Sequence, residues 1–139
     1  MARALVVGGN GLIGSALVDR LVDDGHEVAV FDRYSNGTSH RADGVEVIVG
    51  DLADEVAVEA ALEGRDTLVH LIPVSTPASA DDDPVTDIHD NVARSVRLLQ
   101  SAVEAGIRRA HYASTGGAMY SRDASKPTHE TDAPDPVTP

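Results

Sequence analysis

The sequence predicts an α/β fold in which helices cover both faces of a doubly wound parallel sheet. Short runs rich in Val, Leu and Ala alternate along the chain with longer stretches of helical period, and this alternation is typical of strand–helix–strand units. Aromatic residues make up 3% of the chain and tryptophan is absent, so the core must consist of aliphatic side chains. Parallel strands that are buried on both faces have this composition.

The first half of the chain predicts three strands and two helices. In order they are a strand at 3–7, a helix that follows a glycine-rich turn, a strand at 27–31, a loop at 34–44, a strand at 45–49 and a helix at 54–62. The first helix should end at Gly25, because glycine favours the backbone of a helix C-terminus. Apolar residues recur at helical spacing in both helices, and they are Leu12, Ile13, Ala16, Leu17, Leu21 and Val22 in the first and Ala57, Val58, Ala61 and Leu62 on one side of the second.

The second half predicts two strands, one long helix and an irregular tail. In order they are a strand at 67–71, an exposed mobile loop at 73–84, a helix at 85–105, a strand at 109–113 and a Pro-rich connector at 121–139 that follows a folded domain at 1–120. The long helix should bury a stripe formed by Val92, Val96, Leu99 and Val103. Right-handed crossovers place the strands in the order 3-2-1-4-5.

Composition and charge exclude several classes of function. The formal net charge of −12 repels phosphate backbones and anionic membranes, so neither nucleic acid nor a membrane is an expected partner. No apolar run approaches the ~20 residues of a membrane helix, and the chain enters its first strand without the features of a signal peptide. The lack of cysteine fits a reducing compartment, so we expect a cytoplasmic protein. No spacing of His or acidic residues fits a metal site, and we expect no metal.

A glycine-rich turn joins the first strand to the first helix. Gly8, Gly9, Gly11 and Gly14 satisfy both G-x-G-x-x-G and G-x-x-G-x-x-G. Glycine permits a tight turn and lets backbone N–H groups approach a pyrophosphate at the helix N-terminus. An ordinary glycine-rich turn is the alternative. The dinucleotide interpretation is favoured because the motif follows an apolar strand and opens an amphipathic helix.

Acidic residues follow the second and third strands. Asp32 ends the second strand, where a carboxylate can accept hydrogen bonds from both ribose hydroxyls of an adenosine. Its charge would repel a 2′-phosphate, which favours NAD over NADP, although the neighbouring Arg33 could accommodate that phosphate. Asp51 follows the third strand and either accepts a hydrogen bond from the adenine amino group or caps the next helix.

Two further polar segments follow the fourth and fifth strands. His70 is interpreted as a packed strand histidine rather than a ligand, with residues 71–73 beside the expected cofactor. Ser114 and Thr115 follow the fifth strand, where their hydroxyls would face a nicotinamide; a plain polar turn is the alternative. All these segments lie at the carboxyl ends of strands, and the switch point between the first and fourth strands opens a crevice there.

Taken in order, these motifs resemble those of the extended short-chain dehydrogenase/reductase family, and within it the sugar-nucleotide epimerases and dehydratases. The segments that carry the resemblance are VVGGNGLIG (6–14), FDRYSNG (31–37), GDL (50–52), HLIP (70–73), NV (91–92) and YASTGGAMY (112–120). The resemblance runs from residue 4 to about residue 120. It implies a Rossmann-type domain that lacks the family's last strands and its substrate lobe.

The resemblance also implies roles for individual residues. The implied cofactor contacts are Gly8, Gly11, Leu12, Ile13 and Gly14 at the glycine turn, Asp32, Arg33, Ser35 and Asn36 at the ribose, Asp51 and Leu52 at the adenine, Leu71, Ile72 and Pro73 at the nicotinamide, and Asn91 on the long helix. Thr115 or Ser114 is implied as the catalytic hydroxyl that bonds the reacting sugar oxygen. The family places that hydroxyl four residues before the tyrosine that matches Tyr120, and Gly116 stands there in this chain.

The function implied by the resemblance is that of an NAD-dependent epimerase or dehydratase, which converts a nucleotide sugar through a 4-keto intermediate. The family's catalytic Tyr-x-x-x-Lys pair, the general base of that reaction, does not occur in this sequence. We therefore expect NAD binding by the 139-residue chain without turnover. A non-catalytic NAD-binding or sensing module, and a reductase of the same superfamily acting on a small alcohol or ketone, stay open. The open edge of the fifth strand predicts self-association, and a homodimer stays open as a partner.

Overall fold

The computed structural model describes residues 1–34, 37–72, 83–114, 119–120 and 127–136. The chain forms two compact units. The first comprises Met1–Ile72 and Arg94–Ala113, and the second comprises Pro73–Ala93 and Ser114–Pro139. The first unit contains the sheet and the helices that pack on it.

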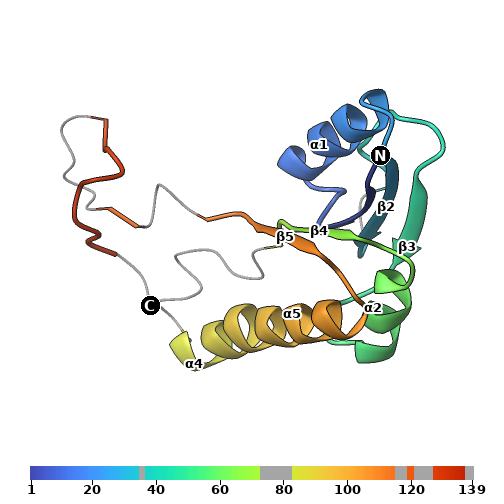
Figure 1. Cartoon of the computed structure of the whole chain (residues 1–139). Helices are drawn as coiled ribbons and strands as arrows, with labels where there is room; N and C mark the ends of the chain where they lie inside the picture. Colours follow the sequence, from blue (N-terminus) through green and yellow to red (C-terminus); the bar gives the residue numbers. More distant parts are fainter. Residues whose placement is uncertain (35–36, 73–82, 115–118, 121–126, 137–139) are drawn as a thin grey trace. The chain divides into compact units, whose positions relative to one another are not determined.

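Five parallel strands form the sheet that the structure describes in the first unit (Figure 1). They are β1 (Arg3–Val7), β2 (Glu27–Asp32), β3 (Glu46–Val49), β4 (Thr67–His70) and β5 (Arg109–Tyr112). Their order, β3-β2-β1-β4-β5, confirms the order predicted from the sequence. Val7 of β1 pairs with Phe31 of β2 on one side and with His70 of β4 on the other. The segments that follow these three strands therefore begin next to one another.

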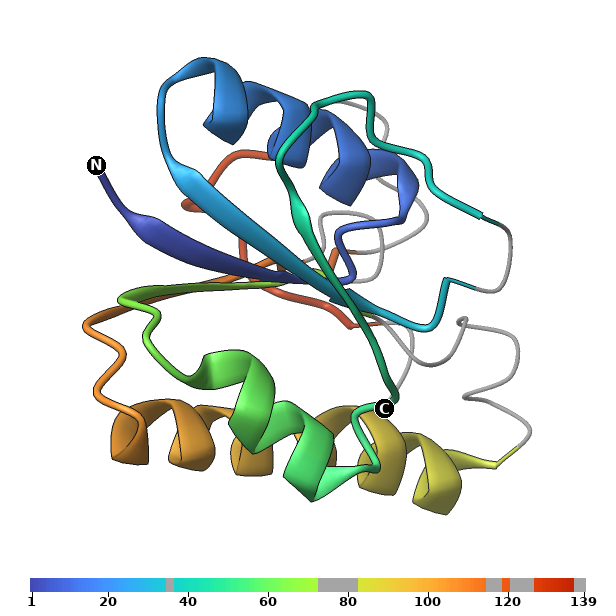
Figure 2. The same ribbon diagram turned by 90° about the vertical axis from the view of Figure 1, so that its right-hand side faces the viewer.

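Helices cover both faces of this sheet, as predicted. Helix α1 (Leu12–Asp23) lies on one face, whereas α2 (Glu55–Leu62) and α5 (Arg94–Glu104) lie side by side on the other (Figure 1, Figure 2). Helix α2 begins at Asp54, whose carboxylate accepts a hydrogen bond from the N–H of Ala57 at 3.1 Å, and such a cap satisfies one of the free donors of a helix start. Helix α1 ends before Gly25, whose φ of +81° suits the predicted glycine terminator.

Each face of the sheet has its own apolar core, because successive side chains of a strand point to opposite faces. The core under α2 and α5 consists of Leu5, Val7, Ala29, Phe31, Val58, Ala61, Leu62, Leu68, Leu98 and Ala102. The core under α1 consists of Val6, Val18, Val28, Val30 and Val69. Both cores are aliphatic apart from Phe31, as the composition predicted, and they hold the carboxyl ends of β1, β2 and β4 in one place.

Among the apolar residues at helical spacing in α1, those of the first turn are exposed. Leu12 is 92% exposed and Ile13 is 71% exposed, whereas Gly14 and Val18 are buried. Gly14 lies against the backbone of the preceding turn, where a Cβ would be 2.2 Å from the carbonyl oxygen of Gly8. This backbone-to-backbone contact sets the rotation of the first turn of the helix and directs Leu12 and Ile13 away from the core.

The predicted long helix was wrong in its continuity and in its buried stripe. The chain forms α4 (Pro84–Asp87), then a π-helical segment (Ile88–Ala93), and then α5. In the described part of these segments the expected stripe is largely exposed, with Val92 55%, Val96 49% and Val103 76% exposed. The buried residues of α5 are Ser95, Leu98 and Ala102. They lie one position earlier than the expected set, and Oγ of Ser95 lies 2.8 Å from Nε2 of the buried His70 on β4.

The described part of the second unit comprises residues 83–93, which contain α4 and the π-helical segment, and residues 114, 119–120 and 127–136. Helix α4 begins at Pro84 and is capped by Asp83, whose carboxylate accepts a hydrogen bond from the N–H of Thr86 at 3.1 Å. The predicted mobile loop at 73–84 lies mostly outside the described residues, and its last residue belongs to this helix. Within residues 114–139 of this unit, the N–H of Asp135 donates to the carbonyl oxygen of Met119 at 2.9 Å.

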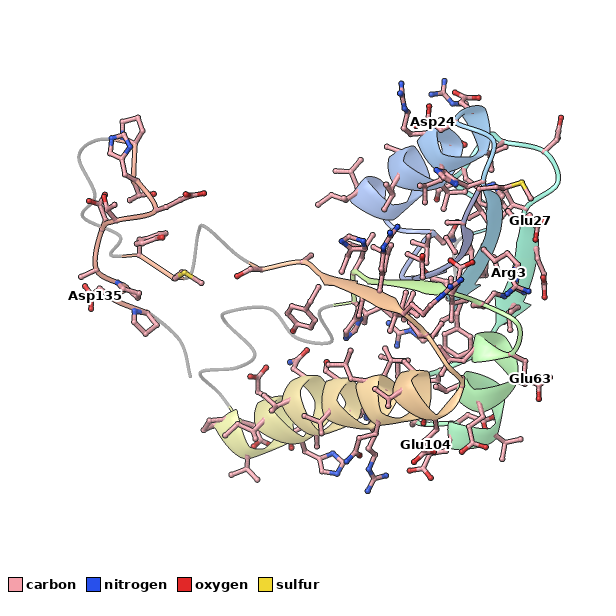
Figure 3. All side chains as sticks on the ribbon, viewed as in Figure 1. Arg3, Asp24, Glu27, Glu63, Glu104 and Asp135 are labelled. Atoms are coloured by element: carbon pink, nitrogen blue, oxygen red, sulfur yellow. The ribbon has the colours of Figure 1, made fainter. Side chains whose placement is uncertain are left out.

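Acidic side chains lie on the outside of the first unit. Asp24, Glu63 and Glu104, which follow or end three different helices, point away from the sheet (Figure 3) and are exposed. No helix among the described residues is long and apolar enough to cross a membrane. Nor is there, in the same part of the chain, a group of three His, Asp or Glu side chains that could hold a metal ion.

Candidate functional site at the carboxyl ends of the strands

The glycine turn follows β1 directly and ends at the first residue of α1. Gly8 has a φ of +85°, a backbone conformation that favours glycine, and its N–H donates to the carbonyl oxygen of Phe31 at 2.9 Å. The N–H of Gly11 donates to the carbonyl oxygen of Gly8 at 3.2 Å. These bonds fold the turn back on itself and tie it to the end of β2.

Three of the four glycines in the glycine-rich motif at 8–14 are required by the fold. A Cβ on Gly8 would be 2.8 Å from the side chain of Ile72, one on Gly9 would be 2.7 Å from Val30, and one on Gly14 would be 2.2 Å from the carbonyl oxygen of Gly8. At Gly11 the nearest atom to a Cβ would be that same oxygen at 3.4 Å, an ordinary contact. Gly11 therefore has a space beside it that the described fold does not fill.

The N-terminus of α1 begins at Gly11 and has no side-chain cap within the part of the chain that the structure describes. Gly11 is the N-cap residue, and the first turn of the helix contains no acidic residue. The first N–H groups of a helix lack partners within the helix and carry part of the positive end of its dipole. This end of α1 can therefore hold an anion, and the first two residues of the helix, Leu12 and Ile13, are exposed.

Asp32 ends β2 beside the glycine turn and is held in one orientation. Its Oδ2 accepts a hydrogen bond from the N–H of Asn10 at 3.0 Å, and its Oδ1 accepts one from the N–H of Tyr34 at 3.3 Å. The pKa of Tyr34 is raised by burial of the phenol and by the nearby charge of Asp32. Arg33, between them in sequence, is exposed. The structure thus brings the predicted carboxylate and the predicted turn together.

Asn10 is a residue of this site that sequence reasoning missed. Its side-chain amide donates to the carbonyl oxygen of Gly37, and its Oδ1 accepts a hydrogen bond from the N–H of Ser39 at 2.7 Å. The glycine motif treats position 10 as variable, so the pattern contained no signal for it. The polar residue in an otherwise apolar and glycine-rich turn is the feature that could have indicated a contact.

Asp51 and Leu52 follow β3 at the same edge of the sheet. The Oδ1 of Asp51 accepts a hydrogen bond from the N–H of Ala53 at 2.9 Å and lies 3.5 Å from Nη1 of Arg94. Asp54, not Asp51, is the cap of α2. Leu52 is partly buried and packs against the core under α2 and α5.

Leu71 and Ile72 follow β4 on the other side of the glycine turn. The N–H of Leu71 donates to the carbonyl oxygen of Val7 at 2.9 Å, which continues the pairing of β1 with β4. The side chain of Ile72 lies against Gly8, as the contact for an added Cβ shows. The end of β4 therefore forms one wall of the space around the turn.

The described structure does not place the remaining predicted site residues beside the glycine turn. Ser35, Asn36, Pro73 and Thr115 lie outside the described residues. Asn91 and Ser114 belong to the second unit. There the amide of Asn91 donates to Oδ1 of Asp87 at 2.8 Å, and Ser114 is exposed.

His70 is a packed strand histidine, as interpreted from the sequence. It is 2% exposed, its Nε2 lies 2.8 Å from Oγ of Ser95 on α5, and its ring meets that of Tyr112 edge to face with centroids 5.1 Å apart. Burial lowers the pKa of His70 from the ordinary value of 6.5. Its neutral ring joins β4 to α5 and β5 beneath the crevice.

The buried His70 predicts a loss of stability in mild acid. The unfolded chain takes up a proton near pH 6.5, whereas the folded state resists it, so stability is fully present above that pH and decreases as the pH falls toward the lower folded pKa. We expect a slope of up to ~1.4 kcal/mol per pH unit from this group, measured by urea unfolding between pH 7.5 and pH 5. H70Q should lack this slope and H89Q, which changes an exposed histidine, should keep it. Equal slopes in both variants would contradict the assignment.

Comparison with known proteins places the chain in a class and in a family. The parallel sheet, the glycine turn at its switch point and the carboxylate at the end of β2 define a Rossmann-type dinucleotide-binding domain. Residues 4–139 match the NAD dependent epimerase/dehydratase family. The chain belongs to this family and corresponds to its NAD-binding domain.

Two relatives and one solved structure illustrate the likeness. UDP-glucose 4-epimerase of Mycolicibacterium smegmatis is 34% identical over 144 residues, which cover 99% of this chain and 46% of that protein. A 3 beta-hydroxysteroid dehydrogenase/Delta 5-->4-isomerase of Mycobacterium tuberculosis is 33% identical over 123 residues, with 86% of this chain and 33% of that protein covered. The structure of Thermus thermophilus UDP-glucose 4-epimerase complexed with NAD has a TM-score of 0.84 at 33% identity, with 98% of this chain and 45% of that chain covered. The chain thus spans about half the length of the epimerases it matches or less.

Proposed function

We propose that this chain binds NAD at the carboxyl ends of β1 and β2 and serves as the cofactor-binding part of a nucleotide-sugar epimerase or dehydratase. The observation that carries the proposal is Gly11. Its φ of −75° and ψ of 174° suit any residue, and its Cβ position is free of close contacts. The described fold therefore does not require glycine at position 11, whereas a pyrophosphate lying against the start of α1 does.

The proposed cofactor contacts follow the crevice from one strand end to the next. The N–H groups at the start of α1 would bind the pyrophosphate, Asp32 would accept the ribose hydroxyls, and Asp51 would accept a hydrogen bond from the adenine amino group. Leu71 and Ile72 would border the nicotinamide. The other proposed contacts are Arg33, Ser35, Asn36, Leu52, Pro73 and Asn91.

The chemistry proposed for the whole enzyme is reversible oxidation of a sugar hydroxyl. NAD, when bound, accepts and returns the hydride, and the hydroxyl of Thr115 or Ser114 would bond the reacting sugar oxygen. We propose that the 139 residues form a cofactor-binding domain at 1–120 and a connector at 121–139. They contain no Tyr-x-x-x-Lys pair, so by themselves they should bind the cofactor without turnover. An assay with NAD and UDP-glucose that detects the 4-epimer tests this, and measurable turnover would contradict it.

A second candidate function is oxidation of a small alcohol such as a hydroxysteroid. It is supported by the 33% identity to the 3 beta-hydroxysteroid dehydrogenase/isomerase. A non-catalytic module that senses NAD is the third candidate, in keeping with the absent Tyr-x-x-x-Lys pair. A version of the protein carrying any sequence encoded beyond Pro139 would separate them, because it should act on UDP-sugars, on steroid alcohols or on neither.

Replacing Asp32 with alanine tests the proposed ribose contact. The carboxylate would accept hydrogen bonds from two hydroxyls, each worth about 1.5 kcal/mol or more to a charged group, so NAD should bind about a hundredfold more weakly to D32A. The NADP affinity should fall much less, because the charge that repels a 2′-phosphate is removed. Calorimetric titration with both nucleotides measures these changes.

The control for this test is D43A, which removes an exposed carboxylate from the loop after β2. It lowers the negative charge of the chain by the same amount without touching the crevice, so its NAD affinity should stay within twofold of the unaltered chain. Unchanged NAD affinity in D32A would rule out the proposed ribose contact.

A further inference from the structure

The loop that follows β2 is attached to the rest of the first unit at two places. At its start, Asn10 of the glycine turn bonds both the carbonyl oxygen of Gly37 and the N–H of Ser39. At its end, Oδ1 of Asp19 on α1 accepts hydrogen bonds from the N–H groups of Arg41 at 2.7 Å and Ala42 at 2.8 Å. The two attachments use the same chemistry, a side chain bonded to loop backbone, but only the first lies in the crevice.

The attachment at Asn10 completes a closed series of hydrogen bonds in which Asp32 is one of four members. The N–H groups of Asn10 and Tyr34 donate to the two carboxylate oxygens of Asp32. The N–H of Gly37 donates to the carbonyl oxygen of Tyr34 at 3.3 Å, and the Asn10 amide donates to the carbonyl oxygen of Gly37. Four residues thus hold one another, and the carboxylate of Asp32 is the member that the proposed function assigns to the ribose.

The side chain at position 10 must donate and accept at once to make this attachment. An amide does so, whereas a carboxylate has no donor and a methyl group has neither. Asn10 is partly exposed, so its burial gives no other reason for an amide here. An exposed polar side chain can make its hydrogen bonds to water. The NH₂ group and the oxygen of the Asn10 amide are instead both bonded to the loop backbone.

We propose that Asn10 is a positioning residue for the cofactor's adenosine half. It fixes the segment after β2 and thereby holds Asp32 in the orientation that accepts the hydroxyls of an unphosphorylated ribose. This inference rests on the proposed function, that the chain binds NAD. A carboxylate that is already oriented loses no freedom when the ligand binds, and such preorganisation raises affinity.

The test compares N10A with D19A, the matched variant at the other end of the loop. N10A keeps the backbone N–H that bonds Asp32 but removes the attachment to Gly37 and Ser39. We expect its affinity for NAD and for ADP-ribose to fall about tenfold, while NADP binding changes less than threefold, so that the preference for NAD shrinks. D19A should lower the melting temperature and leave the NAD affinity within twofold. Amide exchange should become faster at Ser39 in N10A and at Arg41 and Ala42 in D19A.

Three results would overturn the inference. If N10A, folded and with faster exchange at Ser39, binds NAD and NADP as the unaltered chain does, Asn10 holds the loop but does not position the ribose contact. If N10A and D19A weaken NAD equally, any attachment of the loop suffices. If the unaltered chain binds no NAD, the proposed function itself fails and the role of Asn10 fails with it.

Discussion

Replacing Gly14 with alanine should destabilise the protein by about 3 kcal/mol or more. The added Cβ would lie 2.2 Å from the carbonyl oxygen of Gly8 and 2.7 Å from the Cα of Gly9. Both are backbone atoms of the turn and cannot rotate away, so either the turn or the start of α1 must move. Helix propensity alone predicts the opposite sign, because alanine is favoured over glycine within a helix. Thermal unfolding of G14A decides between the backbone clash and helix propensity. We expect the melting temperature to fall by about 12 °C, at roughly 4 °C per kcal/mol.

The control for this prediction is G25A, at the other end of the same helix. Gly25 has a φ of +81°, but a Cβ there meets no atom within 4 Å. Only the backbone conformation opposes the change, at about 1–2 kcal/mol. If G14A were as stable as G25A or more stable, the close approach of α1 to the turn would be refuted.

Replacing Gly11 with alanine should abolish most NAD binding without loss of stability. The fold accepts a Cβ at this position, since the nearest atom would be 3.4 Å away. A pyrophosphate against the same backbone would overlap it, and forcing extra atoms into a packed contact costs about 2–3 kcal/mol. NAD affinity should therefore fall roughly 30- to 150-fold, measured by calorimetry alongside thermal unfolding.

The reciprocal pair of variants separates binding from folding. G25A should unfold at a lower temperature and bind NAD normally, whereas G11A should unfold normally and bind NAD poorly. Normal NAD affinity in G11A would show that no ligand approaches this backbone and would remove the principal support for the proposed function.

The local signals in the sequence predicted the framework of the site well. The glycine turn, the strands on either side of it and the strand order were confirmed, and the structure places Asp32 beside the turn. These features depend on neighbouring residues: a turn needs glycine at fixed positions, and the carboxyl end of a parallel strand leads to one edge of the sheet. The ranges of β1 and α2 were correct to within one residue for the same reason.

The sequence failed where a residue's surroundings come from distant parts of the chain. Hydrophobicity placed Val96 and Val103 in the core, but Ser95 and Ala102 are buried instead, and the hydroxyl of Ser95 meets His70, which lies 25 positions away. Leu12 and Ile13 are exposed because Gly14 approaches the turn. Asn10 was overlooked because its partners, Gly37 and Ser39, are 27 and 29 positions away.

By itself the sequence determined the class of fold, the strand order and the position of the glycine turn, since periodicity and glycine spacing act over a few residues. Only the tertiary structure decided which glycines serve the fold and which one leaves room beside it, how Asp32 is oriented, and which side of each helix is buried. Those properties are distances between atoms far apart in the chain, and they exist only after the strands and helices have packed.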